Sequence, residues 1–225
     1  MGEDHQAHQP ALTVLLCYGN LNFGRAKDHG NDVARMRAEG ADVIALVELD
    51  RPMQPPGFHA HQPDRWDRSV GSEGIYVDRR IPIESTGKQR AATNRLGRAI
   101  GWRSILTVVI EPPGMDLMAV VVVHMPPKRM WGPLYTAYAA RLRATLRRLN
   151  RRGIPWVVAG DWNKYLRDDP ADLGHTFRGR WYGERIDGWH VHPKLVDNVK
   201  GWHTWQPPGR NDSHPYCYLN LGPKK

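Results

Sequence analysis

Four short hydrophobic segments of this chain each end in polar residues, and this pattern constrains the fold more than any other feature. The segments 12–20, 41–48, 118–124 and 157–163 end in Asn20, Glu48, His124 and the pair Asp161 and Asn163. Runs of β-branched residues of this length predict buried strands. A core strand gains nothing in packing from a polar end, so we expect the four strand ends to converge on one polar site.

The segment 157–163 is the most informative of the four because it ends in Gly-Asp-Trp-Asn. Gly160 allows the backbone to turn sharply after the strand. Asp161 and Asn163 are two residues apart, so in an extended chain their side chains point the same way. Asp and Asn are also common in ordinary turns, and the tetrapeptide alone leaves a capped turn as an equal alternative. The other three segments favour a functional site.

Seven motifs, in order along the chain, resemble those of the endonuclease/exonuclease/phosphatase superfamily, which includes pancreatic-type deoxyribonuclease and exonuclease III-like repair nucleases. They are Asn20–Arg25, Ala41–Glu48, the pair Glu73–Val77 and Arg79–Ile83, Val121–His124, Gly160–Asn163, Arg185–Asp187 and Asn211–Pro215. The resemblance implies a four-layer α-β-β-α sandwich, an α/β fold with two packed mixed β-sheets. We expect one such domain over residues 11–225, after a disordered tail of residues 1–10.

The chain departs from the family pattern in three places. Asn22 stands where many members carry Asp, which removes a negative charge and makes a second divalent ion less assured. Gly188 replaces an aromatic residue. In the last motif, either His214 is the family's His and Ser213 replaces the preceding Asp, or Asp212 is that Asp and Ser213 occupies the His position. We favour His214, because a loop absorbs a one-residue shift easily, whereas the other register removes the general base.

The resemblance also implies the residues of the site. The implied catalytic residues are His124, Asp161, Asn163, Asp187 and His214, and the implied metal-binding residues are Asn20, Asn22, Glu48 and Asp212. Oxygen ligands of this kind suit Mg²⁺ or Mn²⁺ better than zinc. We expect Asp161 to orient and deprotonate a water molecule. Asp187 is expected to fix the tautomer of His214 and to raise its pKa.

The formal net charge of +9 favours a polyanionic partner. Residues 85–103 carry five cations and no acid, and residues 125–132 add further cations directly after a predicted strand. The residues expected to bind substrate are Arg103, Lys128, Arg129 and Trp131. Arginine binds phosphate oxygens in a bidentate manner, and tryptophan stacks on bases. A solvated loop is the alternative interpretation of residues 85–103.

Between the motifs, the sequence predicts helices over residues 27–39 and 133–152. Residues 50–72 are expected to form a loop with one short strand, and residues 73–87 strands around Arg79 and Arg80. Residues 85–103 are expected to form a long connection, and residues 164–184 a loop with a short helix. Two or three strands are expected to finish the chain. The two cysteines, at positions 17 and 217, do not form a disulfide framework, and we expect buried thiols.

We therefore expect a divalent-metal-dependent phosphodiesterase that hydrolyses nucleic acid, with DNA favoured over RNA. One alternative is a phosphatase or phosphodiesterase acting on a small-molecule or lipid phosphate, and another is a catalytically inactive relative that only binds nucleic acid. The sequence has no signal-peptide pattern and no apolar run long enough to cross a bilayer. We expect a cytoplasmic protein, of a bacterium or a phage-infected cell, with no membrane association and no obligate protein partner.

Overall fold

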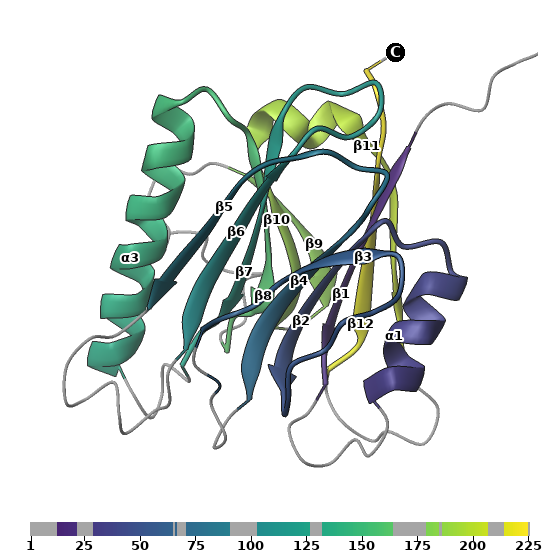
Figure 1. Ribbon diagram of the computed structural model, residues 1–225. Coiled ribbons are helices and arrows are strands. Elements are labelled where there is room, and N and C mark those ends of the chain that lie inside the picture. Colours follow the sequence, from purple (N-terminus) through teal and green to yellow (C-terminus); the bar gives the residue numbers. More distant parts are fainter. Residues whose placement is uncertain are drawn as a thin grey trace, which may run out of the picture.

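The structure is a computed structural model that describes residues 13–21, 29–64, 66, 71–90, 103–126, 132–163, 179–184, 186–206 and 214–224. Within these residues, two six-stranded sheets pack face to face (Figure 1). In spatial order, the first sheet contains β11 (Val199–Trp205), β12 (Tyr216–Leu221), β1 (Val14–Asn20), β2 (Val43–Leu49), β4 (Ser72–Asp78) and β3 (Phe58–His61). The second contains β5 (Ile83–Arg90), β6 (Ser104–Ile110), β7 (Met118–His124), β8 (Trp156–Asp161), β10 (Asp187–Val191) and β9 (Arg180–Glu184).

Helices cover the outer faces of both sheets. Helix α1 (His29–Ala38) lies on the first sheet and α3 (Gly132–Arg151) on the second (Figure 1). A 3₁₀ helix, η3 (Pro193–Asn198), connects β10 to β11. This arrangement confirms the predicted four-layer α-β-β-α sandwich. The expected tail of residues 1–10 lies outside the described residues.

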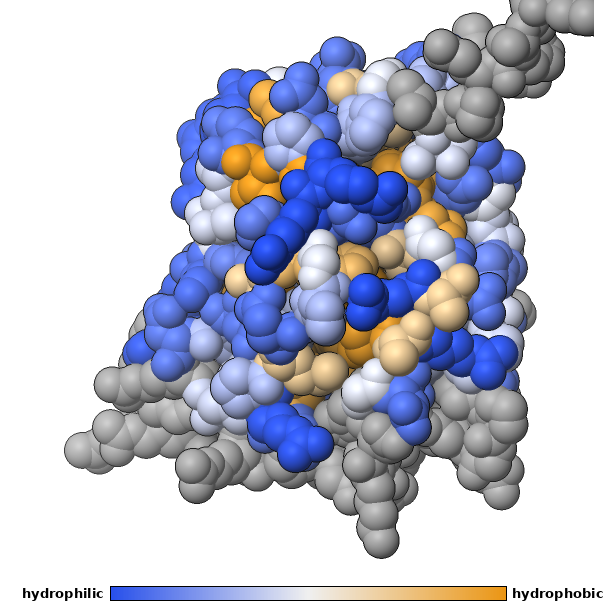
Figure 2. Space-filling view, turned by 45° about the vertical axis from the view of Figure 1, so that its right-hand side comes forward, coloured by the Kyte–Doolittle hydropathy of each residue, from blue (hydrophilic) through white to orange (hydrophobic). Residues whose placement is uncertain are grey.

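Hydrophobic packing occurs in three places: between the sheets, under α1 and under α3. Strand β7 shows why its sequence is continuously apolar rather than alternating. Val120 and Val122 face the core between the sheets, whereas Val121 and Val123 face α3. A strand that is buried on both faces needs apolar residues at every position. Figure 2 shows one face of the molecule. Most of the coloured residues on it are hydrophilic, and hydrophobic residues appear in patches between them.

Each sheet contains one pair of parallel strands, and these two pairs position the site. Strand β1 runs parallel to β2, with Asn20 opposite Val47, and β7 runs parallel to β8, with His124 opposite Asp161. All four strands end at the same edge of the sandwich, the lower edge in Figure 1. We call this edge the site edge.

The structure differs from the predicted elements at two strands. Strand β5 covers residues 83–90, so it continues beyond the strands expected over residues 73–87 into the expected connection, and residues 180–184 form β9 where a loop was expected. Both are outer strands with many exposed positions, so neither carries the apolar run by which a buried strand is recognised. The short strand within residues 50–72 is confirmed as β3, and both cysteines are confirmed as free, buried thiols. None of the described helices is both long and apolar enough to span a bilayer.

The stripe of α3 that packs on the second sheet should contribute most of the stabilisation by this helix. Leu146 is fully buried there, whereas the adjacent Arg147 is exposed. We expect Leu146→Ala to lower the free energy of unfolding by roughly 2–5 kcal/mol, because it leaves a cavity under the helix. Arg147→Ala should change it by at most about 0.5 kcal/mol. Urea denaturation measures both, and equal effects would contradict the observed orientation of α3.

Candidate functional site

Four side chains from the two parallel strand pairs meet at the site edge. The amide nitrogen Nδ2 of Asn20 donates to Oε1 of Glu48 and to Oδ2 of Asp161, each at 3.3 Å. Nε2 of His124 lies 3.5 Å from the same Glu48 oxygen and 3.8 Å from Oδ2 of Asp161. The first sheet therefore contributes an amide and a carboxylate, and the second sheet an imidazole and a carboxylate, to one cluster.

A hydrogen-bonded chain of three residues adjoins this cluster. Asp187 begins β10 and lies opposite Asp161 in the antiparallel ladder. Its Oδ2 lies 2.8 Å from Nδ1 of His214, and its Oδ1 accepts a hydrogen bond of 2.8 Å from the hydroxyl of Tyr18. His214 thus occupies the position next to Asp187, as in the favoured register of the last motif. Ser213 lies outside the described residues.

Burial and neighbouring charges give the two histidines opposite protonation. Burial lowers the pKa of His214, but the hydrogen bond and charge of Asp187, with the charges of Asp161 and Glu48, raise it overall to about 9. Burial lowers the pKa of His124 well below its ordinary value, and the positive charges of Arg103 and His214 lower it further. At neutral pH the site therefore holds a cationic His214 beside a neutral His124.

The acids of the cluster suit a bound cation. Burial, followed by the charge of Asp187, raises the pKa of Asp161 to about 8. The charge of His214 offsets only part of the cost of burying one carboxylate beside another. The ligand atoms of Glu48, His124 and Asp161 lie within 4.8 Å of one another, and the Glu48 side chain is 20% exposed, which provides access. Carboxylate oxygens are ligands for Mg²⁺ or Mn²⁺, so these residues fit the divalent ion expected from the sequence.

A second group, Asp161, Asp187 and His214, also brings three ligand atoms within 4.8 Å. Its imidazole nitrogen Nδ1 is already hydrogen-bonded to Asp187. The group around Glu48 is therefore the better metal site of the two.

The backbone at Glu48 adopts an uncommon conformation that aims its side chain at the cluster. Glu48 has a φ of 60°, and it lies in an irregularity of the β2–β4 ladder, where Leu46 pairs with Gly74 but Leu49 pairs with Ser72. Between these two pairs, β2 advances by three residues and β4 by two, so β2 contains one extra residue, as in a β-bulge. Such a φ is uncommon for a residue with a Cβ, and strained conformations of this kind cluster at functional sites.

Gly71 makes the bulge at Glu48 sterically possible. A Cβ at this position would lie 2.5 Å from the carbonyl carbon of Glu48 and 2.6 Å from its Cα. Gly71 also has a φ of 70°, which favours glycine. Both properties require glycine beside the displaced strand.

Arg103 was predicted to bind substrate, and the structure corrects this interpretation. Arg103 is only 7% exposed, and its Nη1 donates to the backbone carbonyls of His124 and Met125, each at 2.8 Å. Tyr138 adds to this support, since its hydroxyl donates to the carbonyl of Ser104 and accepts from the backbone N–H of His124. Arg103 therefore holds the end of β7 in place rather than facing a ligand.

The structure brings most of the predicted residues together. Asn20, Glu48, His124, Asp161, Asp187 and His214 form the site described above. Asn163 lies beside them, with a φ of 48°; its side chain donates to the carbonyl of Met125 and its backbone N–H to Oδ1 of Asp161. The predicted residues Asn22, Lys128, Arg129, Trp131 and Asp212 lie outside the described residues.

Sequence reasoning missed Tyr18 and Gly71. Tyr18 lies two residues before Asn20 in β1, so both side chains point to the same face of the sheet, and this spacing was the available signal. Nothing in the local sequence distinguishes Gly71 from a loop glycine, because its role depends on contact with a distant strand.

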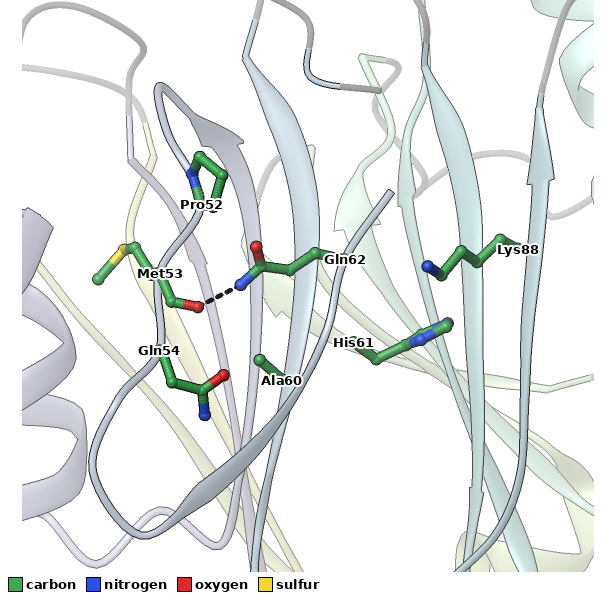
Figure 3. Close-up of a pocket in the computed structure, with 7 residues that line it drawn as sticks. All are labelled: Pro52, Met53, Gln54, Ala60, His61, Gln62 and Lys88. Carbon is green, nitrogen blue, oxygen red and sulfur yellow. Dashed lines mark hydrogen bonds between the residues drawn. The ribbon is translucent and has the colours of Figure 1, made fainter. Parts of the chain in front are cut away.

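Two cavities elsewhere in the described part of the molecule contain none of the site residues. One, of about 360 Å³, lies between the outer strands β3 and β5 (Figure 3). His61 hydrogen-bonds there to the carbonyl of Gly87 at 3.0 Å and links the two sheets, and Lys88 approaches from β5. The other, of about 1340 Å³, includes Pro155 and Lys224 and lies at the end of the sandwich opposite the site edge.

Substitution of Gly71 should disturb Glu48 specifically. We expect Gly71→Ala to displace the Glu48 backbone and to weaken Mn²⁺ binding by roughly 10–100-fold, as is typical when the support of a ligand is lost. Gly153→Ala is the matched control, because Gly153 has a φ of 72° but no atom within 4 Å of the added Cβ. Titration of Mn²⁺ followed by electron paramagnetic resonance measures both variants. Equal Mn²⁺ affinities would show that Gly71 does not position Glu48.

The raised pKa of His214 should depend on Asp187. In the presence of a chelator, the imidazole of the wild type should titrate near pH 9, and Asp187→Asn should lower this pKa toward or below 6.5. The interaction therefore stabilises the fold fully below pH 6.5 and is lost as the pH rises through about 9. NMR titration of the ring protons measures the pKa, with the exposed Asp116→Asn as control. An unchanged pKa in Asp187→Asn would refute the proposed origin of the shift.

Comparisons with known proteins agree with this architecture. The model of the Endonuclease/Exonuclease/phosphatase family matches residues 18–220. No match was found among curated protein sequences. Solved structures with a similar fold include the human Nocturnin catalytic domain with bound sulfate, with a TM-score of 0.71 and 12% identity over 95% of both chains. Truncated TDP2 of Caenorhabditis elegans has a TM-score of 0.67 and 15% identity over 93% of this chain and 98% of that chain.

A third similar structure is the mannosyl-6-phosphatase Bt3783 of Bacteroides thetaiotaomicron VPI-5482, with a TM-score of 0.63 and 13% identity over 92% of this chain and 98% of that chain. At such identities these structures establish a common fold, whereas the family model covers every described residue of the site. The chain therefore belongs to the endonuclease/exonuclease/phosphatase family, whose members are hydrolases of phosphoester bonds.

Proposed function

We propose that this protein is a Mg²⁺-dependent phosphodiesterase that hydrolyses nucleic acid, with DNA favoured over RNA. The observation that carries the proposal is the site itself: two facing carboxylates beside a neutral and a cationic histidine. These are the groups that phosphodiester hydrolysis needs, namely a cation site, a proton acceptor and a positively charged hydrogen-bond donor. The formal net charge of +9 supports a polyanionic substrate.

The residue that would hold the metal is Glu48, and the amide of Asn20 fixes the orientation of its carboxylate and of the neighbouring Asp161. A divalent cation bound there neutralises phosphate charge and stabilises the negative charge that develops on the leaving oxygen. A second ion is less assured, because Asn22 replaces the Asp that many family members carry.

Asp161 is the proposed general base. Its pKa of about 8 lies near neutral pH, where proton transfer from a water molecule is most effective. The adjacent Asn163 has its amide nitrogen bonded to Met125, so its Oδ1 remains to orient a water molecule.

The two histidines have different proposed roles. His214 donates through Nδ1 to Asp187, so its Nε2–H is available to a phosphate oxygen as a cationic donor. His124 is neutral, and its Nε2 faces the carboxylates. The proton on this nitrogen would bind a non-bridging phosphate oxygen at the same position.

A phosphatase acting on a small phosphate ester is the second candidate. The fold of this chain is similar to that of a mannosyl-6-phosphatase, and the same site chemistry serves both kinds of ester. A catalytically inactive nucleic-acid-binding protein is the third, because Asn22 lacks the charge of the usual Asp.

Activity assays distinguish these candidates. We expect nicking of supercoiled plasmid and degradation of single-stranded DNA in Mg²⁺, and loss of both in EDTA. Asp161→Asn and His214→Ala should each lower kcat by roughly 10²–10⁴-fold, because each removes a positioned proton-transfer group. Circular dichroism should show that both variants fold, and Asp116→Asn, at an exposed acid beyond the site, should retain wild-type activity.

Other outcomes would contradict the proposal. Release of inorganic phosphate from monoesters without strand scission would identify the phosphatase. A salt-dependent gel shift without cleavage would identify the inactive relative.

A further inference from the structure

A surface on one side of the sandwich combines aromatic and cationic side chains outside the site described above. The outer strand of the first sheet, β11, contacts the outer strand of the second sheet, β9. Trp202 lies in β11 and is 47% exposed, and it is the only exposed large hydrophobic residue in the described part of the chain. We call the surface formed by Arg180 and Trp202, over the buried ring of Tyr182, the seam surface.

Contacts between the two strands hold the seam surface in place. The ring of Trp202 lies 6.3 Å from that of Tyr182 in an edge-to-face arrangement, with an angle of 66° between the planes. The hydroxyl of Thr204 donates to Glu184 at 2.6 Å. Thr204 and Trp202 are two residues apart and share a face of β11, so both contacts fix the side of β11 that is turned toward β9. Trp202 is therefore oriented and accessible at the same time.

A cation lies beside these aromatic residues. The guanidinium of the exposed Arg180 is 5.6 Å from the ring of Tyr182. Of the nearby acids, Glu184 accepts the bond from Thr204 and keeps its negative charge, whereas Asp197 lies 3.7 Å from Lys224. The seam surface thus presents an exposed aromatic side chain near a cation. Proteins bind single-stranded nucleic acid with this combination, in which bases stack on aromatic rings and phosphates contact cations.

The register of β11 and β12 gives the distance of the seam surface from the site edge. Trp202 lies opposite Leu219 and Trp205 opposite Tyr216, which is two residues from His214. Five residues of extended chain separate His214 from the level of Trp202, which corresponds to about 17 Å. This distance spans roughly five nucleotides at the ~3.4 Å spacing of stacked bases.

We propose that the seam surface is a subsite for a single-stranded segment of the substrate that runs from the site edge along β11. A base stacks on Trp202, and a phosphate contacts Arg180. The subsite rests on the proposed action on nucleic acid and deepens it, because it requires substrates that extend at least about five nucleotides beyond the cleaved bond on one side.

Kinetics with oligodeoxynucleotides of graded length test the subsite. For the wild type, KM should fall once the single strand extends more than about five nucleotides past the cleaved bond, in either the 5′ or the 3′ series. Trp202→Ala should raise KM for the long substrates by roughly 5–100-fold, as expected for loss of one stacked base. The kcat, and the KM for short substrates, should remain unchanged. Trp202→Phe should restore most of the long-substrate affinity.

Binding measured without cleavage tests the cation separately. In EDTA, fluorescence anisotropy with a labelled single strand gives the dependence of log K on log salt concentration. Arg180→Ala should reduce the slope of this dependence by about 0.7. Arg147→Ala, which removes an exposed cation on the outer side of α3, is the matched control and should leave the slope unchanged.

The outcomes separate the subsite from the proposed function. If the wild type cleaves nucleic acid but Trp202→Ala has the same KM for long substrates, the subsite is wrong and the proposed function stands. If the wild type binds single strands through Trp202 without cleaving them, the surface stands and the nuclease proposal fails. Absence of both binding and cleavage would overturn both.

Discussion

The joint termination of two parallel strand pairs at one edge is the constraint on which the rest of the site depends. Strands β1 and β2 deliver Asn20 and Glu48 from one sheet, and β7 and β8 deliver His124 and Asp161 from the other. Sheet packing fixes the separation of the two pairs, so the cluster needs no loop to assemble it. The resulting concentration of buried acid is costly without compensating charge, and it accounts for both the raised pKa of Asp161 and the fit to a divalent cation.

Supporting contacts determine how these side chains are used. Asp187 gives His214 its positive charge, while burial keeps His124 neutral, so two residues of the same type offer different chemistry. Gly71 permits the bulge that orients Glu48, and a hydrogen bond from Arg103 to the carbonyl of His124 holds the end of β7. Rigid strands and buried hydrogen bonds thus preorganise the groups that would act on a phosphate ester.

Much of this arrangement was predictable because patterns among neighbouring residues in the sequence indicate it. Apolar runs that end in polar residues marked β1, β2, β7 and β8 and their convergence, and the order of the motifs indicated the four-layer sandwich. Strand β9 and the end of β5 were not predicted, because outer strands lack an apolar run. The role of Arg103 was mistaken for a similar reason, since a cation in a basic segment looks the same in sequence whether it faces solvent or backbone carbonyls.

The sequence by itself determined the residue types, the strand ends that carry them and the family to which the chain belongs. Only the tertiary structure decided which side chains are within bonding distance of one another, that His214 contacts Asp187, that Arg103 is buried, and that Trp202 stands exposed beside Tyr182. The physical reason is that hydrophobic periodicity is a property of neighbouring residues. Burial, charge coupling and steric contact arise between strands that are far apart in the chain, and they exist only once the two sheets have packed.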